Sequence, residues 1–452
     1  MSGVSVRKRK KAYRSFGLSI AGLTAKKDLG ELVFSEGINC DFSKGKISVG
    51  LGAEQLKNVR GVELVAEFSD DEAASVCVYF EHEDLQTGAS VCALLKDGRL
   101  LFYNAAGATF TEAGEEFPKN SLLLPVYEKG VPAAIAVVGQ RGVRVVYPSG
   151  EITVMYEKPV ASVAAFYHGR IFFTDGFAVR YGAPFVFDDY QEDADGAGAI
   201  ELGSEGGELV ALVSVGEKLF VVRQHELAEI SAAGAAREFA VKRIAYGGGE
   251  IKKDGVCAVG ESLTFLASDG VYRYLQGEFT KLVSGKIEEL NEEKAIVASA
   301  AGDKYRLAYT DKNAKKKVLV VDTEDGSCYS SFVLYGLQNG SFTVGIRSCR
   351  FFKAADKAEI PSDEECYARV FKVDFGESGE KVVRKISCFG RGRVALTIRS
   401  SRGERKSELV LTPKDSMEFA LKGREFDMEI SLENGAVIER IEVEYDLLGG
   451  GK

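Results

Sequence analysis

The densest group of side chains that could do chemistry is an acidic run that ends before Gly196. Its five carboxylates are Asp188, Asp189, Glu192, Asp193 and Asp195. Clustered carboxylates ahead of a glycine are the kind of ligand that Ca²⁺ prefers. The calcium loop of a helix–loop–helix hand does not fit, however, because Gln191 would take its first ligand position and Leu202 its last. We therefore predict no metal here and interpret the run as a contact loop or a solvated loop.

A second charged group lies near the N-terminus, where six cations fall within eight residues. They are Arg7, Lys8, Arg9, Lys10, Lys11 and Arg14. Because little apolar surface precedes Phe16, we predict that residues 1–15 form a disordered arm that contacts a partner. The cations could bind DNA phosphates or an acidic groove on a protein, and a solvated tail is the simpler alternative.

No other group of residues predicts catalysis. The three histidines, His82, His168 and His225, lack the spacing of a metal site, which favours surface polar roles. Neither a G-x-x-x-x-G-K-[ST] phosphate loop nor a G-x-S-x-G nucleophile elbow occurs. A glycosidase needs two facing carboxylates, and no Trp is present to stack on a sugar, although Tyr could replace it. We therefore predict no catalytic residue and no cofactor.

The cysteines and the overall charge bear on compartment and partners. Eight cysteines are scattered without a C-x-x-C pair, and several lie in apolar, strand-like runs. This pattern favours buried, reduced thiols in a protein assembled in a cytoplasm over a disulfide framework. The net charge of −9 argues against a chain that coats nucleic acid over its whole surface. No apolar segment of a signal peptide follows the basic cluster, and no apolar run approaches the roughly 20 residues of a membrane span.

The elements that must position these groups are short strands, and the clearest set runs from Gly255 to Lys286. Strands are predicted there at Val256–Val259, Leu263–Ala267, Val271–Tyr274 and Glu278–Leu282. Ser268-Asp269-Gly270 and Gln276-Gly277 supply the turn residues that tolerate a positive φ.

Similar units of strand, glycine turn and aromatic strand recur along the chain. They begin near residues 89, 134, 163, 211, 258 and 303. A period of roughly 40–50 residues is that of four-stranded propeller blades, so we predict an all-β fold with a β-propeller of about six blades, five to seven fitting the same period. The propeller is expected over residues 56–385, after an extended segment at 16–55. A small C-terminal β-sandwich-like region is expected over 386–448, with a polar tail at 449–452.

Three passages resemble the β-propeller structural proteins of tailed double-stranded DNA phages. The first joins Glu36–Asp41 to Gly45–Gly52, where Leu51 departs from the usual Arg-Pro-Gly ending. The second comprises Gly169–Thr174, Pro184-Phe185, Ile200–Leu202 and Glu217–Val222. The third joins Phe265–Tyr272 to Ser284–Ile287. The group comprises tail accessory, adaptor and packaged-DNA-stabilising proteins, and the resemblance covers most of residues 35–335.

The resemblance implies a non-enzymatic structural component of a phage or prophage virion. Such a protein would lie in the tail or head–tail connector, dock on portal, adaptor or tail proteins, and be homo-oligomeric in the virion. It would be assembled in the cytoplasm of the host bacterium. Two alternatives remain open: a carbohydrate-binding or glycoside-cleaving propeller that acts at cell surfaces, and a cytosolic propeller scaffold of a bacterial host.

Overall fold

The computed structural model divides the chain into two compact units. The repeat unit comprises Ala53–Gly326 and Phe332–Ala358, and the terminal unit comprises Met1–Gly52, Ser327–Ser331 and Glu359–Lys452. The structure describes residues 14–20, 31–32, 34, 36–55, 76–77, 93–96, 99–104, 109–118, 121–128, 131–147, 149–188, 190–191, 196–232, 234–285, 287, 290–291, 294, 296–331, 337–339, 342–347, 350–355, 360, 365–375 and 378–448.

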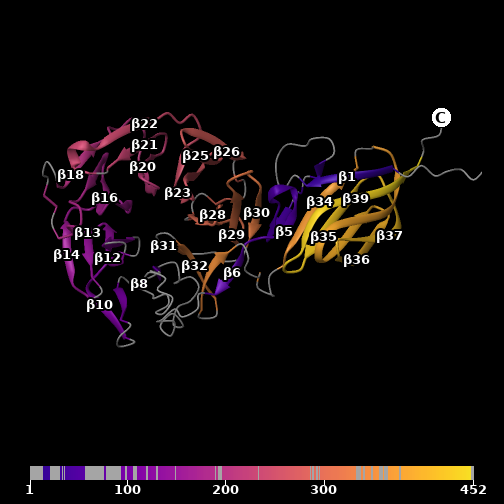
Figure 1. Cartoon of the computed structure of the whole chain (residues 1–452), viewed down its shortest axis with the longest axis horizontal. Helices are drawn as coiled ribbons and strands as arrows, with labels where there is room; N and C mark the ends of the chain where they lie inside the picture. Colours follow the sequence, from indigo (N-terminus) through magenta and orange to yellow (C-terminus); the bar gives the residue numbers. More distant parts are fainter. Residues whose placement is uncertain are drawn as a thin grey trace, which may run out of the picture. The chain divides into compact units, whose positions relative to one another are not determined.

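The repeat unit is built from four-stranded antiparallel sheets that follow one another along the chain (Figure 1). The first contains β7 (Val76–Cys77), β8 (Ala93–Lys96), β9 (Arg99–Asn104) and β10 (Thr109–Glu116). The next contains β11 (Leu122–Glu128), β12 (Val131–Gly139), β13 (Gly142–Val146) and β14 (Ile152–Tyr156). It is followed by the sheet of β15 (Ala164–Tyr167), β16 (Arg170–Asp175), β17 (Ala178–Tyr181) and β18 (Gly198–Glu201).

Two further sheets repeat the same order of strands. One contains β19 (Leu209–Val215), β20 (Lys218–Arg223), β21 (Leu227–Ser231) and β22 (Ala240–Ile244). The other contains β23 (Ile251–Val259), β24 (Ser262–Ala267), β25 (Gly270–Leu275) and β26 (Glu278–Ser284), and corresponds to the four strands predicted between Gly255 and Lys286.

The last part of the repeat unit departs from simple chain order. Strands β27 (Val297–Ala301), β28 (Lys304–Thr310) and β29 (Lys316–Asp322) pair in sequence. Strands β31 (Leu337–Asn339), β32 (Phe342–Arg347) and β33 (Arg350–Ala355) are joined by β6 (Gly52–Gln55), which comes from the beginning of the chain. The all-β prediction is confirmed, and the repeated four-stranded sheets are compatible with a propeller-like fold.

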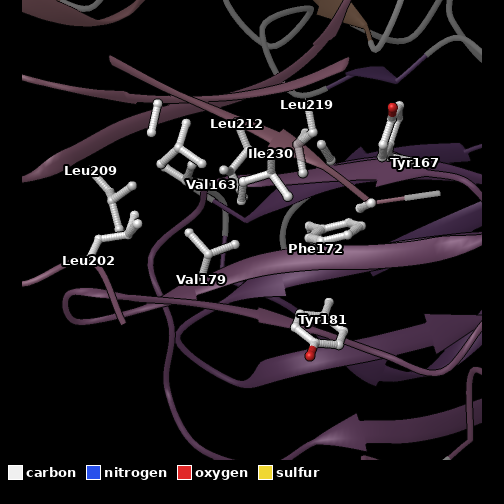
Figure 2. Close-up of a cluster of buried hydrophobic side chains, with 14 residues drawn as sticks. Val163, Tyr167, Phe172, Val179, Tyr181, Leu202, Leu209, Leu212, Leu219 and Ile230 are labelled. Atoms are coloured by element: carbon white, nitrogen blue, oxygen red, sulfur yellow. The ribbon is translucent and has the colours of Figure 1, made fainter. Parts of the chain in front are cut away.

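Alternate residues of the central strands explain how one sheet packs on the next. Ile171 and Phe173 of β16 lie in a buried cluster with the sheet of β11–β14. Phe172, between them, lies in a different cluster with Leu212 and Ile230 of the sheet of β19–β22 (Figure 2). Since successive side chains of a strand point to opposite faces, each such sheet is apolar on both faces. Each buried Phe, Leu or Ile contributes about 1.5–3 kcal/mol to this packing.

A carboxylate holds the turn between β24 and β25. Asp269 Oδ1 accepts a hydrogen bond from the Gly249 amide at 2.9 Å. Its Oδ2 accepts hydrogen bonds from the Tyr272 hydroxyl and the Lys281 ammonium, each at 2.6 Å. Burial raises the pKa of this carboxyl, but the hydrogen bonds from Lys281, Tyr272 and Gly249 outweigh burial and lower the pKa to about 2. The aspartate of the predicted Asp-Gly turn therefore also connects β25 and β26 of its sheet to the residues before β23.

The terminal unit is organised by one strand of 20 residues, β35 (Lys381–Ser400). Its first half pairs with β37 (Lys414–Gly423) and β39 (Val437–Leu447), and its second half with β36 (Gly403–Leu411) and β38 (Phe426–Leu432). Gly390 and Gly392, with φ of 150° and 87°, lie where the partners change. A Cβ at Gly390 would overlap the Val437 carbonyl oxygen, so only glycine fits there.

The terminal unit also takes strands from distant parts of the chain. These are β1 (Arg14–Ile20), β2 (Glu31–Leu32), β3 (Glu36–Ile38), β4 (Cys40–Asp41), β5 (Ile47–Val49), β30 (Cys328–Ser331) and β34 (Tyr367–Val373). A 3₁₀ turn, η1 (Ser43–Gly45), connects β4 to β5, and another, η3 (Ala236–Glu238), lies in the repeat unit. The division at 385/386 in the sequence prediction therefore differs from the structure, in which β35 crosses that boundary.

The prediction of a disordered arm is wrong at Arg14. This residue begins β1 and pairs in register with Tyr445 of β39. The pairing continues to Leu18 opposite Ile441. These antiparallel ladder hydrogen bonds order the backbone at a position where the cluster of cations suggested none.

The Asp269 network predicts a specific dependence of stability on pH. Because the folded pKa lies below the ordinary value of 3.8, the stabilisation is present above about pH 4 and is lost as the pH falls towards 2. Asp269→Asn should flatten the fall in the free energy of unfolding over this interval, measured by urea titration at each pH. The effect should be smaller than the pKa difference implies, because the carboxylate is 40% exposed. Exposed Glu261→Gln is the control; an unchanged slope in Asp269→Asn would contradict the role of the network.

The glycine bend in β35 gives a second prediction. Gly390→Ala should lower the free energy of unfolding of the terminal unit by about 3 kcal/mol or more, through a strained backbone and steric overlap. Gly379→Ala, where a Cβ meets only Leu447 at 3.6 Å, is the matched control. The check is calorimetry of both variants; equal melting temperatures would show that the bend tolerates a side chain.

Candidate functional site

The acidic run lies in the loop between β17 and β18, residues 182–197. Asp188 is exposed, and Tyr190 is half-buried. Asp189, Glu192, Asp193 and Asp195 lie outside the described residues, as do the arm residues Arg7, Lys8, Arg9, Lys10 and Lys11. The structure therefore describes both ends of the predicted contact loop and, of its five carboxylates, Asp188.

A buried arginine fastens both ends of this loop. Arg170, at the start of β16, is 2% exposed. Its Nη1 donates hydrogen bonds to the carbonyl oxygens of Gly182, at 2.8 Å, and Gly196, at 2.6 Å. The guanidinium lies 5.3 Å from the ring centroid of Phe239. Burial lowers the pKa of Arg170, and the carbonyl dipoles and the aromatic face compensate part of the lost hydration.

A second cluster fixes the middle of the loop. Asp175, at the end of β16, accepts hydrogen bonds from the Tyr156 hydroxyl at 2.7 Å and from Arg180 Nε at 2.9 Å. Arg180 also donates to the Tyr190 hydroxyl, which donates to the Gly198 carbonyl. The hydrogen bond from Tyr156 is the largest cause that lowers the pKa of Asp175. Burial and that same bond raise the pKa of Tyr156 to about 12.

Three acidic side chains lie near Tyr147, beside the loop. The carboxylates of Glu128, Asp188 and Glu151 lie close enough to Tyr147 to raise the pKa of its phenol, after burial as the largest cause. Glu128 is the last residue of β11, Asp188 lies in the loop itself, and Glu151 lies in the turn before β14. Such a group of acids attracts Lys- or Arg-rich segments and speeds their encounter.

Phe185 and Val186 add exposed apolar area next to Asp188. Phe185 is 57% exposed and has a φ of 57°, and Val186 is 40% exposed. The Phe185 amide donates to the Gly169 carbonyl at 2.7 Å, and a Cβ at Gly169 would meet the Phe185 ring at 2.6 Å. A positive φ is rare for an aromatic residue and costs about 1–3 kcal/mol, so the fold must hold this conformation. In the sequence, Phe185 belongs to the second of the three resembling passages, but no local pattern predicts a role for it.

His168 and His225 are exposed and lie in turns, and His82 lies outside the described residues. His168 has a φ of 47° in the turn before β16, and its ring lies 4.2 Å from that of Tyr167. The His225 amide donates to the Gly206 carbonyl. Within the described part of the chain, no three His, Cys, Asp or Glu residues are grouped to hold a metal ion. In the same residues, no helix combines the length and the hydropathy that a bilayer crossing requires.

The contact surface, defined here as Phe185, Val186, Asp188 and Glu151, should depend on Arg170. Arg170→Ala leaves the Gly182 and Gly196 carbonyls without their charged donor, so we expect a loss of about 2–4 kcal/mol in stability. Limited proteolysis should then cleave first within residues 182–197. Arg141→Ala, which removes an exposed cation, is the control and should change stability by at most about 0.5 kcal/mol. Unchanged cleavage in Arg170→Ala would show that the loop does not need this anchor.

Comparison with known proteins places the chain in no family. No protein-family model matches it, and no curated protein matches it. A solved structure with some likeness is PorZ, described as an essential bacterial surface component of the type-IX secretion system of Porphyromonas gingivalis. The two are 10% identical with a TM-score of 0.32, over 62% of this chain and 40% of PorZ. The matched part thus spans less than half the length of PorZ, and a likeness at this level identifies neither a shared fold nor a shared function.

Proposed function

We propose that this chain is a non-enzymatic docking scaffold, and that it serves as a structural component of a phage or prophage virion. The observation that carries the docking role is the contact surface. Phe185 is held exposed in a costly backbone conformation beside Asp188, and buried Arg170 and the Asp175 cluster fix the loop around both. Exposed polar and apolar residues on a rigid scaffold are typical of recognition. The virion setting, in the tail or head–tail connector, is supported by the sequence resemblance.

We further infer that the sheets are blades of one propeller. In support, the first strands of successive sheets contact one another, from β11 to β15, β19, β23, β27 and β31, and β31 contacts β7. If the paired strands β27–β29 are counted as one blade, the described residues contain seven such groups of strands, the upper end of the predicted range. In this arrangement β6 completes the sheet of β31–β33 and joins the beginning of the repeat to its end.

The proposed partners follow from charge and from the resemblance. The acidic contact surface suits a cationic segment of a portal, adaptor or tail protein. The basic arm, Arg7–Lys11, suits an acidic groove or DNA phosphates. A homo-oligomeric ring in the virion would repeat both features around its axis.

Removal of the arm tests this role. Deleting residues 2–13, just before β1, should leave the melting temperature within about 2 °C of the full chain, because no described strand is lost. Incorporation into particles from the host strain should fall at least tenfold, as measured by quantitative immunoblotting of gradient fractions. Arg402→Gln with Arg405→Gln, at exposed positions of the terminal unit, is the control and should be incorporated normally.

Two results would overturn the proposal. One is absence of the full-length chain from purified particles whose portal and tail proteins are present. The other is saturable binding of the chain to bacterial surface polysaccharide, or cleavage of it, which would favour the glycan-directed alternative. A large drop in melting temperature on deletion would instead assign the arm to the fold.

A further inference from the structure

Two cysteines far apart in sequence meet in the terminal unit. The Sγ atoms of Cys40 and Cys366 are 3.4 Å apart. Cys40 is fully buried, and Cys366 is 8% exposed. Both are free thiols, as are Cys257 and Cys388. Two thiols at this separation need to move by only about 1.4 Å to reach the length of a disulfide bond.

The backbone on both sides of the pair is held in place. Asn39 precedes Cys40 in a left-handed conformation, with φ of 53°. Its amide donates to the Ser330 carbonyl, and its Nδ2 donates to the Glu365 carbonyl at 2.8 Å. Ser331 Oγ donates to Asn39 Oδ1 at 2.7 Å, and Cys366 Sγ donates to the Asn39 carbonyl at 3.1 Å. These bonds fix residue 39 against β30 and against the residues before β34, and so hold the two sulfurs in register.

We propose that Cys40 and Cys366 are a redox-active pair that forms an intramolecular disulfide when the chain meets a disulfide oxidant. The Cys366 thiolate attacks one sulfur of a small-molecule disulfide RSSR, forms a mixed disulfide and releases RS⁻. The Cys40 thiolate then attacks the Cys366 sulfur, forms the Cys40–Cys366 bond and releases the second RS⁻. The two thiol protons pass through solvent to the leaving thiolates, so two RSH form and the oxidant gains two electrons. Cys366 is the entry point because it retains some exposure.

Burial keeps this reaction slow at neutral pH. Desolvation raises the pKa of Cys40 well above its usual value, and the neighbouring Cys366 and Asp41 raise it further. Since only the thiolate is nucleophilic, oxidation should accelerate with pH. The cross-link would join β4 to the residue that precedes β34, 326 positions further along the chain. It would therefore stabilise the terminal unit, and the inference does not depend on the virion role.

The experiment uses the full chain, in the native state and refolded from urea, each incubated with oxidised glutathione at about pH 8.5. Peptide mapping without reduction should show one cross-linked species that joins the peptides of Cys40 and Cys366. The melting temperature should rise in the wild type and fall back on addition of dithiothreitol. Cys366→Ser should abolish both the cross-link and the rise, whereas Cys388→Ser, the control at another buried cysteine, should keep them. Cys366→Ala is the second variant if the serine hydroxyl disturbs folding.

Each other outcome counts against the proposal. Free thiols at both positions after refolding in the oxidant would overturn it, as would a dominant pairing of either residue with another cysteine. A glutathione adduct that persists at Cys366 without closure would show that Cys40 does not resolve it.

Discussion

The burial of both faces of successive sheets is the constraint on which the repeat unit depends. In β16, Ile171 and Phe173 serve one interface while Phe172 serves the next. In β20 the same alternation sends Leu219 and Val221 to one neighbour and Phe220 and Val222 to the other. A sheet with two apolar faces is unstable alone, so each sheet is stable only between its neighbours. Asp269, in a turn, and Arg170 and Asp175, at the two ends of β16, form their hydrogen bonds where strands begin or end.

Most of the contact surface lies in a loop, since Phe185, Val186 and Asp188 belong to residues 182–197 and only Glu151 comes from the turn before β14. Arg170 donates hydrogen bonds to the Gly182 and Gly196 carbonyl oxygens, at the two ends of the loop of residues 182–197. Carbonyl oxygens and aromatic faces offset the free-energy cost of burying the Arg170 guanidinium. The anchored loop then holds the exposed Phe185 side chain in one backbone conformation. Such preorganisation reduces the entropy that a partner must overcome on binding.

Strand pattern and turn chemistry predicted much of the fold. The Gly255–Lys286 stretch forms β23–β26 with Gln276 and Gly277 at positive φ, as expected from local residues alone. The terminal unit was less predictable, because the pairing of β1 with β39 and of β3 with β34 joins residues more than 300 positions apart. Local sequence carries no signal for such register. The Cys40–Cys366 pair, 326 positions apart, was missed for the same reason. Arg170 was missed although its carbonyl partners in the loop lie only 12 and 26 residues away, because no local pattern marks a buried arginine that binds backbone carbonyls.

The return of N-terminal strands to late partners also sets the order of events during synthesis. Strand β6 can pair only after β33 (Arg350–Ala355) has been made, and β1 and β3 only after β39 and β34, so each unit completes its pairing late in synthesis. In the meantime these strands carry unpaired edges that can join with other nascent chains. Contacts of this sequence separation also slow folding. The architecture that ties the beginning of the chain to its end thus makes the newborn chain dependent on protection from its neighbours.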